Sequence, residues 1–212
     1  MRVLITGGRG GLGRAFAEAL PDAEITSLDI ADGFDVGDPG AWRALEGDFD
    51  AAFLNAGITT GEADVASLTD EQYVRALRAN VDGVVYGTRE LASRLMPKGG
   101  SIVATASLAG LTAVPMDPIY SLTKHAVVGF VRSVAPQLAA RGIRINALCP
   151  GFADTPIVAS EVRELIDVPL IEPSFVADAA LQALNDEETG RAWVVQPNHI
   201  VPFRFQNLPG PR

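Results

Sequence analysis

Short runs of apolar residues alternate along the chain with longer segments in which apolar residues recur about every 3.6 positions. The short runs are residues 3–5, 24–28, 50–54, 101–105, 143–148 and 192–195, and each is expected to form a buried strand. The longer segments are residues 12–20, 69–96, 118–141 and 175–184, and each is expected to form a helix. Strands buried on both faces and separated by helices predict an α/β fold with a doubly wound parallel sheet of six or seven strands.

Residue types at the starts of two helices support these boundaries. Thr69, with a glutamine three residues later, is typical of a capping box. Asp117 followed by Pro118 is a cap followed by a proline in the first helical turn. No repeat or linker interrupts the chain, so we expect one domain over residues 1–212, with residues 198–212 as an irregular C-terminal tail.

The second crossover between strands is unusually short. Only a handful of residues separates Leu28, the end of the second strand, from the next strand-like piece, Phe34-Asp35-Val36. A crossover between parallel strands needs about a dozen residues or more. We therefore expect the edge strand after the second strand to be lost or reduced to a stub.

Composition narrows the possible functions. The 212 residues carry 17 Lys and Arg against 26 Asp and Glu, a net charge of −9. This balance argues against a nucleic-acid partner, because such proteins present a basic face to phosphates. The single cysteine, Cys149, cannot form an internal disulfide, and no residue pattern predicts a metal site. The sequence has no signal-peptide core and no run of apolar residues long enough for a membrane span, so we expect a cytoplasmic protein.

Residues 6–13, TGGRGGLG, follow the first strand and open the first helix. Glycines let the backbone turn tightly and approach a pyrophosphate, and the start of a helix offers free N–H groups. The spacing is TGxxxGxG rather than GxGxxG. A glycine-rich turn without a ligand is the alternative, but the position between a strand and a helix favours a dinucleotide site.

Two charged residues bear on the choice between NAD and NADP. Asp29 closes the second strand, 22 residues after Gly7, where an acid can accept hydrogen bonds from the adenosine ribose and repels the 2′-phosphate of NADP. Arg9 has the opposite preference, because a cation in this loop can pair with a phosphate, although it can equally be a solvated arginine. We expect NAD, with NADP possible.

Tyr120 and Lys124 lie four residues apart and therefore on one face of a helix. A free tyrosine has a pKa near 10, so a tyrosine acting as a base near neutral pH needs a pKa lower by roughly 2–3 units. A nearby lysine, together with a positively charged nicotinamide ring, has the right sign to lower it. Ser107 ends the preceding strand and can hydrogen-bond the same substrate oxygen. Singly, each is more often an ordinary surface or core residue; together they predict a site of proton transfer.

In order and rough spacing, five motifs resemble the short-chain dehydrogenase/reductase family: residues 6–13, Asn55-Ala56-Gly57, Ser107, Tyr120-x-x-x-Lys124 and Pro150-Gly151. The resemblance extends from Met1 to about Pro197. It implies a single-domain Rossmann-like fold, binding of NAD or NADP, and hydride transfer between the cofactor and a secondary alcohol or ketone. The chain is similar to a shortened member, with residues missing in the second crossover and after Thr155, where a substrate lid is expected.

The resemblance also implies a role for each matching residue. Tyr120 is the general acid/base, Lys124 lowers the pKa of the tyrosine and holds the nicotinamide ribose, and Ser107 polarises the substrate carbonyl. Asn80 matches the helix asparagine of a water-linked proton relay. The implied cofactor contacts are Gly7, Arg9, Gly11, Leu12, Gly13, Asp29, Asp35, Val36, Asn55, Ala56, Gly57, Tyr120, Lys124, Pro150, Gly151 and Thr155.

By family position, the residues expected to face the substrate are mostly apolar: Leu108, Val114, Met116, Ile157 and Val158. They predict a neutral, fairly apolar secondary alcohol or ketone. The alternatives are an NADPH-dependent ketoreductase and a non-catalytic, cofactor-binding regulatory protein on the same fold. In relatives the long helices that begin near Thr69 and Pro118 pair across a two-fold axis, so we expect a homodimer or homotetramer.

Overall fold

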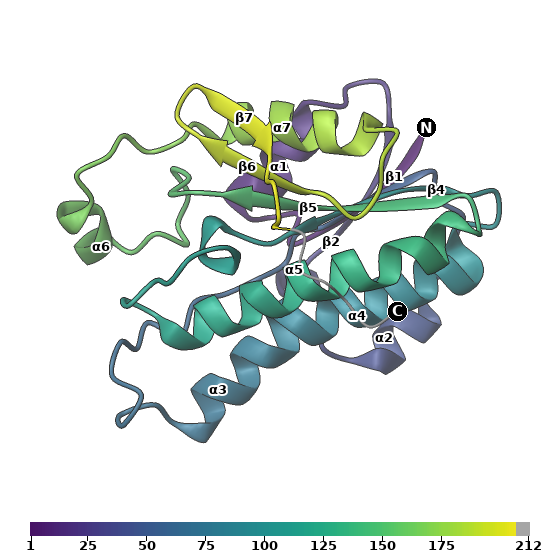
Figure 1. Cartoon of the computed structure of the whole chain (residues 1–212). Helices are drawn as coiled ribbons and strands as arrows, with labels where there is room; N and C mark the ends of the chain where they lie inside the picture. Colours follow the sequence, from purple (N-terminus) through teal and green to yellow (C-terminus); the bar gives the residue numbers. More distant parts are fainter. Residues whose placement is uncertain (207–212) are drawn as a thin grey trace.

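The computed structural model describes residues 1–206, apart from the side chains of residues 161 and 165. Within this part of the chain, seven strands form one sheet in the order β2-β1-β3-β4-β5-β6-β7 (Figure 1). The strands are β1 (Arg2–Thr6), β2 (Glu24–Leu28), β3 (Ala51–Leu54), β4 (Gly100–Thr105), β5 (Ile143–Pro150), β6 (Ala192–Gln196) and β7 (His199–Pro202). Strands β1 to β6 pair in parallel and β7 pairs antiparallel with β6. The predicted doubly wound sheet is confirmed.

Helices cover both faces of the sheet. One face carries α1 (Gly11–Glu18) and α7 (Pro173–Asn185), and the other carries α2 (Pro39–Ala44), α3 (Asp70–Leu77), α4 (Gly83–Glu90) and α5 (Pro118–Ala139) (Figure 1). A short helix, α6 (Ser160–Leu165), lies in the loop after β5. Successive residues of β1 point into different cores: Val3 and Ile5 pack with α1 and α7, and Leu4 packs on the opposite face. Burial on both faces explains the uninterrupted apolar runs in the sequence.

The second crossover has no strand among the described residues, so β2 is an edge of the sheet, as predicted. The chain instead makes a 3₁₀ turn, Ile30–Asp32, and then α2, which the sequence pattern did not predict. Val36 is buried, and its carbonyl oxygen accepts a 2.8 Å hydrogen bond from Nε1 of Trp42. A Cβ at Gly83 would lie 2.8 Å from Cγ2 of Val36, so the strand-like piece packs directly against α4.

Residues 69–96 do not form one uniform α-helix, which corrects our expectation. The predicted capping box is present at the start of α3. Two π-helical turns, Arg78–Asp82 and Leu91–Leu95, flank α4. In the first π turn Asn80 is buried, and its side chain bonds both backbone groups of Ile58. Such turns occur frequently at functional sites.

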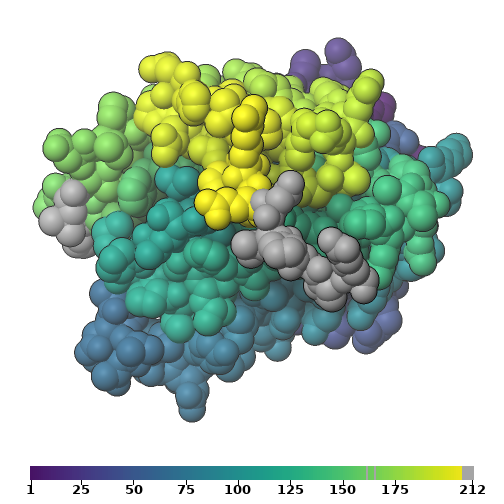
Figure 2. Space-filling model, viewed as in Figure 1, coloured from purple at the N-terminus to yellow at the C-terminus, as the bar shows by residue number. Residues whose placement is uncertain are grey.

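Residues 198–212 were expected to be irregular, and part of this segment is not. Asn198 adopts a φ of +59°, in the left-handed region that asparagine tolerates, and β7 then returns along β6. Phe205 packs on Arg132 of α5, with the guanidinium carbon 3.6 Å from the ring centroid. In Figure 2 the last described residues, in yellow, lie on the surface of the molecule. Residues 207–212 lie outside the described part.

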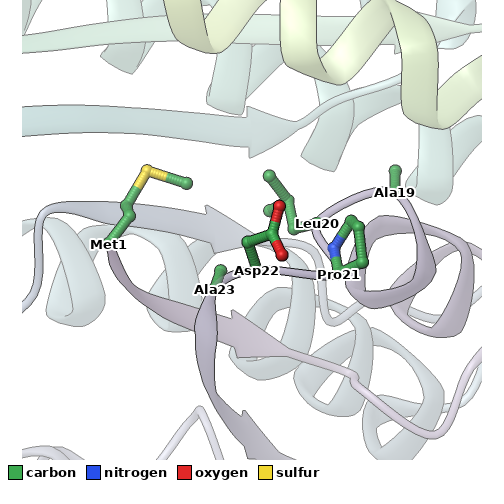
Figure 3. Close-up of a pocket in the computed structure, with 6 residues that line it drawn as sticks. All are labelled: Met1, Ala19, Leu20, Pro21, Asp22 and Ala23. Carbon is green, nitrogen blue, oxygen red and sulfur yellow. The ribbon is translucent and has the colours of Figure 1, made fainter.

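A pocket at the amino end of the sheet is lined by Met1 and by residues 19–23 of the turn between α1 and β2 (Figure 3). Ligand sites of doubly wound sheets form at the carboxyl ends of the strands, so this pocket lies at the opposite end from the expected site. Within residues 1–206, no helix combines the length and the apolar character needed to cross a membrane. The described His, Cys, Asp and Glu side chains form no cluster that could hold a metal ion.

Candidate active site

The carboxyl ends of β1, β3, β4 and β5 lead into most of the predicted site residues. These are the glycine loop after β1, Asn55-Ala56-Gly57 after β3, Ser107 after β4 and Pro150-Gly151 at the end of β5. The first two turns of α5 add Tyr120 and Lys124. Neighbouring parallel strands therefore bring together segments that lie far apart in the sequence, at the edge where ligands bind in this type of sheet.

Close backbone packing explains the glycines of the loop. Gly7 has a φ of +65°, which favours glycine. A Cβ at Gly13 would lie 2.7 Å from Cα of Gly8, and a Cβ at Gly11 would lie 2.6 Å from Cγ2 of Thr155. Gly10 begins α1 without a side-chain cap, so no capping side chain occupies the N–H groups of the first helical turn. This glycine cradle, formed by Gly7, Gly11 and Gly13, fits a pyrophosphate, because a pyrophosphate needs close approach of the backbone and free N–H donors.

The predicted ribose-binding acid, Asp29, is tied to the glycine loop. One carboxylate oxygen accepts from the N–H of Arg9 at 3.0 Å, and the other accepts from the N–H of Ala31 at 3.0 Å. The side chain of Arg9 forms a two-pronged ion pair with Asp32, in which Nε donates at 2.8 Å. This hydrogen-bonded pairing raises the pKa of Arg9 above its usual value. Arg9 is therefore an exposed side chain that is paired with a carboxylate.

Asn55-Ala56-Gly57 binds the end of β3 to the neighbouring strands. The hydroxyl oxygen of Thr6 accepts from the N–H groups of Asn55 and Ala56, at 2.9 and 3.1 Å. The side-chain amide of Asn55 donates to the Thr6 carbonyl at 3.2 Å and accepts from the hydroxyl of Thr105 at 3.2 Å. The segment thus steadies the centre of the sheet, where β1, β3 and β4 end.

Tyr120 is partly buried and hydrogen-bonded to Ser107. Burial raises the pKa of Tyr120 to about 12; the hydrogen bond with Ser107 lowers this pKa and the carboxylate of Asp117 raises it. The Ser107 hydroxyl also donates to the carbonyl of Pro150 at 3.3 Å and accepts from the N–H of Ala109 at 3.1 Å. In the chain alone, the tyrosine is therefore protonated at neutral pH.

Lys124 is fully enclosed beside the tyrosine. Its Nζ donates to the carbonyl of Thr105 at 2.8 Å and lies 5.4 Å from the ring centroid of Tyr120. Burial lowers the pKa of Lys124 to about 8, so the amine remains mostly charged at pH 7. A Cβ at Gly57 would lie 3.3 Å from Nζ, so the glycine leaves space around the amine. The lowering of the Tyr120 pKa by Lys124 stays a prediction.

Asn80 connects the first π turn to the site. Its Oδ1 accepts from the N–H of Ile58 and its Nδ2 donates to the carbonyl of Ile58, both at 2.8 Å. Nδ2 also donates to the hydroxyl of Thr123 at 2.9 Å, next to Lys124. The side chain therefore positions the loop after β3 against α5, and its part in a proton relay stays a prediction.

Asp117 does more than the helix capping that the sequence indicated. Its buried carboxylate accepts four hydrogen bonds. The donors are the N–H of Tyr120 at 2.8 Å, the N–H and hydroxyl of Thr60 at 2.7 Å each, and the N–H of Gly61 at 3.1 Å. It joins the helix turn that carries Tyr120 to the loop after β3. The capping position alone was visible in the sequence, because the partners in the loop follow no local pattern.

The loop after β5 is short and internally braced. Gly151 donates to the carbonyl of Val195 at 2.9 Å, and Thr155 is buried against the glycine loop. Arg163 bonds the carboxylate of Asp154 at 2.5 Å and the carbonyl of Thr155 at 2.8 Å, and it also bonds the carbonyl of Val158. The predicted lid is therefore a segment that Arg163 braces from within.

Asp35, Val36 and Leu12 are less directly connected to this centre. Asp35 accepts from the N–H of Gly37 at 2.8 Å and pairs with Arg78 at 2.8 Å, while Val36 is buried against α4. Leu12 packs against the core of α1 and α7. The cofactor contacts assigned to these three residues stay predictions.

A glycine cradle between β1 and α1 and an acid at the end of β2, at the carboxyl edge of a parallel sheet, are typical of the dinucleotide-binding class of α/β proteins. Residues 8–193 match the family model described as enoyl-(acyl carrier protein) reductase. The chain belongs to the short-chain dehydrogenase/reductase family, a family of oxidoreductases. The predicted family and its Rossmann-like fold are confirmed.

Individual relatives agree with this assignment. A 3beta-hydroxysteroid dehydrogenase of Mediterraneibacter gnavus is 32% identical over 184 residues, covering 73% of this chain and 67% of the relative. Among solved structures, a 3-oxoacyl-[acyl-carrier protein] reductase from Brucella melitensis with bound NAD is 30% identical, with a TM-score of 0.79 over 92% of this chain and 88% of that one. An actinorhodin polyketide ketoreductase with NADPH is 25% identical, with a TM-score of 0.80 over 92% and 95%. The aligned part spans from 46% to 86% of the length of the curated relatives.

Proposed function

We propose that this protein is an NAD(P)-dependent dehydrogenase or reductase that transfers a hydride between a nicotinamide cofactor and a secondary alcohol or ketone. The observation that carries the proposal is the convergence of Ser107, Tyr120 and Lys124 at the same carboxyl edge of the sheet as the glycine cradle. The relatives, named as one dehydrogenase and two reductases, support it. A non-catalytic regulatory protein has no physical need for this trio.

The side chains of the site divide the work of alcohol oxidation. A bound oxidised nicotinamide supplies the hydride acceptor and a positive charge. Ser107, held by Pro150 and Ala109, orients the substrate oxygen. The Lys124 ammonium stabilises the phenolate form of Tyr120. The phenolate oxygen takes the hydroxyl proton as the C–H hydride leaves, and Tyr120 ends this step as a neutral phenol. In ketone reduction the tyrosine returns its proton to the substrate oxygen.

The favoured cofactor is NAD. In this proposal Gly7, Gly11 and Gly13 surround the pyrophosphate and Asp29 receives the ribose hydroxyls. The engagement of Arg9 by Asp32 supports NAD, because it leaves the loop without an unpaired cation for a 2′-phosphate. The NADPH-bound ketoreductase among the structural relatives keeps the NADPH-linked reductase as the alternative.

The substrate side of the site favours a neutral, apolar compound. Leu108, Val114 and Val158 are partly buried, while Met116 and Ile157 expose 38% and 41% of their surface. The lid arginine is already engaged by a carboxylate and by carbonyls, so it offers no unpaired cation to an acidic substrate. Apolar surface at an entrance favours apolar substrates.

Two measurements test the function. NADH and NADPH are titrated into the protein, and a panel of neutral and carboxylated alcohols is then assayed with each cofactor by nicotinamide absorbance. We expect submillimolar binding of NADH and turnover of neutral secondary alcohols. Tyr120→Phe should lower kcat by about 10²-fold or more, as expected for loss of a general acid/base, while NADH still binds. Tyr73→Phe, on the exposed face of α3, is the matched control. Full turnover by Tyr120→Phe would contradict the proposal.

We also propose a homodimer or homotetramer located in the cytoplasm. Val74 of α3 and Leu122 of α5 expose 50% and 46% of their surface, and they lie on the helices expected to pair. Light scattering should give a multiple of 22.3 kDa for the wild type and a smaller assembly for Leu122→Glu. The single buried cysteine, Cys149, suits a reducing compartment.

A further inference from the structure

A bidentate ion pair stands at the edge of the sheet beside the acid that ends β2. Arg9 donates from Nε to one carboxylate oxygen of Asp32 at 2.8 Å, and a second guanidinium nitrogen bonds the other oxygen. The two side chains are 62% and 42% exposed. Pairs this exposed contribute little to folding.

The backbone determines the position of the arginine. The N–H of Gly8 donates to the carbonyl of Leu28 at 3.2 Å, and the N–H of Arg9 donates to the carboxylate of Asp29 at 3.0 Å. The glycine loop is therefore attached to the end of β2. The guanidinium extends from a point where it could reach a phosphate on the ribose that Asp29 is proposed to bind.

The short crossover places the aspartate opposite this arginine. After Asp29 the chain turns back in the 3₁₀ turn Ile30–Asp32, and Gly33 ends the turn with a φ of +87°. The N–H of Asp32 donates to the carbonyl of Asp29 at 3.0 Å. The Asp32 carboxylate therefore meets the guanidinium directly across the end of β2.

We infer that Asp32 is a specificity-determining residue for the cofactor: it engages Arg9 and so withholds from NADP the cation that would pair with the 2′-phosphate. The inference rests on the proposed function. A phosphate would have to displace a carboxylate that already occupies the guanidinium fork. Asp29 and Asp32 together also outnumber Arg9 in charge, so the local field repels a phosphate. NAD has no 2′-phosphate and avoids both costs.

Asp32→Asn tests the inference by binding alone. Dissociation constants of NADH and NADPH are measured by calorimetry on wild type and variant, without substrate. We expect NADPH to bind about tenfold more tightly relative to NADH in the variant, because the guanidinium becomes available to the phosphate. Asp32→Ser should shift the ratio in the same direction. Glu18→Gln, exposed at the end of α1, makes the same change in net charge and should leave the ratio unchanged.

The double variant Arg9→Gln/Asp32→Asn separates engagement of the arginine from simple repulsion. Most of the gain in NADPH affinity should disappear when Arg9 is absent. The inference is overturned if the gain in NADPH affinity persists without Arg9, or if Asp32→Asn leaves the ratio of NADPH to NADH affinity unchanged. In either case, NADH binding by the wild type leaves the proposed function standing. Failure of the wild type to bind either dinucleotide overturns both.

Discussion

Lys124 and Tyr120 are ionisable side chains placed where water is largely excluded. Burial lowers the pKa of Lys124 to about 8 and raises that of Tyr120 to about 12. The shifts have opposite signs because burial favours the neutral form of each group. Both residues therefore reduce folding stability at some pH, as residues retained for chemistry often do.

The cost of the buried lysine should depend on pH. The pKa of Lys124 is about 8 in the folded chain and about 10.4 when unfolded, so between these values the unfolded chain holds a proton that the folded chain has released. Stability then rises with pH over this window. Lys124→Met should exceed the wild type in unfolding free energy by about 3 kcal/mol at pH 7.5, and this difference should shrink by about 2 kcal/mol at pH 9.5.

Denaturant titrations of both proteins without added dinucleotide check this. A difference that is the same at the two pH values would contradict the burial of a charged Lys124. The raised pKa of Tyr120 does not affect this comparison of unfolding free energies. It changes stability only above pH 10, where the unfolded chain loses the phenolic proton and the folded chain keeps it.

The glycine loop offers a second prediction at the residue scale. A Cβ at Gly13 would lie 2.7 Å from Cα of Gly8, so Gly13→Ala must push the loop apart. We expect about 1–3 kcal/mol lower stability and at least about tenfold weaker NADH binding. Gly129 lies within α5 with no atom within 4 Å of a Cβ, so Gly129→Ala should gain about 0.5–1 kcal/mol. Thermal unfolding and NADH titration distinguish the two variants. A loss of stability of equal size in Gly13→Ala and Gly129→Ala would refute the steric argument.

At the element scale, the ends of the helices depend on residues from distant loops. The first turn of α5 is capped by Asp117, which also holds Thr60 and Gly61 of the loop after β3. The first π turn is held in the same way, through the bonds of Asn80 to Ile58. Two sets of hydrogen bonds to the loop after β3, made by Asp117 and by Asn80, thus position Tyr120 and Lys124.

Asp117→Asn should disturb the site by weakening the hydrogen bonds that join Tyr120 to the loop after β3. An amide has only one oxygen that accepts hydrogen bonds. Its NH₂ group would therefore face donors whose hydrogen bonds the second carboxylate oxygen of Asp117 accepts. We expect a loss of about 2–3 kcal/mol in stability and a lower kcat, since the turn carrying Tyr120 loses its anchor. Loss of the carboxylate charge also lowers the pKa of Tyr120, so the acid limb of the kcat/KM profile should move to lower pH.

Asp22→Asn, in the exposed turn before β2, is the control for charge. A purely structural role for Asp117 would reduce stability and leave the pH profile in place. An unchanged profile in Asp117→Asn would therefore show that its carboxylate does not act on the tyrosine.

At the scale of the whole molecule, the crossover after β2 and the loop after β5 both lie at the carboxyl edge of the sheet. The crossover after β2 brings Asp32 to Arg9, and the loop after β5 is braced by Arg163. The parallel bridge between Ala153 and Ile171 closes the base of this second loop.

Arg163→Ala should loosen the lid without unfolding the protein. Its side chain is only partly buried, so global stability should change little, while loss of its bonds to Asp154, Thr155 and Val158 should speed amide exchange in residues 152–172 by about tenfold. Exchange measured by mass spectrometry, with Arg75→Ala on exposed α3 as the control, checks this. Unchanged exchange in the segment would show that other contacts hold the lid.

Part of the fold followed directly from local patterns. Apolar runs predicted β1 to β6 because burial on both faces of a sheet requires continuous apolar residues. The capping residues Thr69 and Asp117 marked helix starts because capping is a local interaction. The two π turns, α2, α6 and β7 were not predicted, since each is short and depends on contacts with distant segments.

The sequence by itself determined the α/β class, the loss of a strand after β2, and the residue types of the site, because these depend on periodicity, chain length and spacing. Only the tertiary structure decided which partners these residues have. The contacts of Asp117 with Thr60, Arg9 with Asp32, and Arg163 with the lid join segments that carry no matching pattern. The sheet sets such pairings by bringing the carboxyl ends of its strands together, and a charged side chain then bonds whichever donor or acceptor lies within reach.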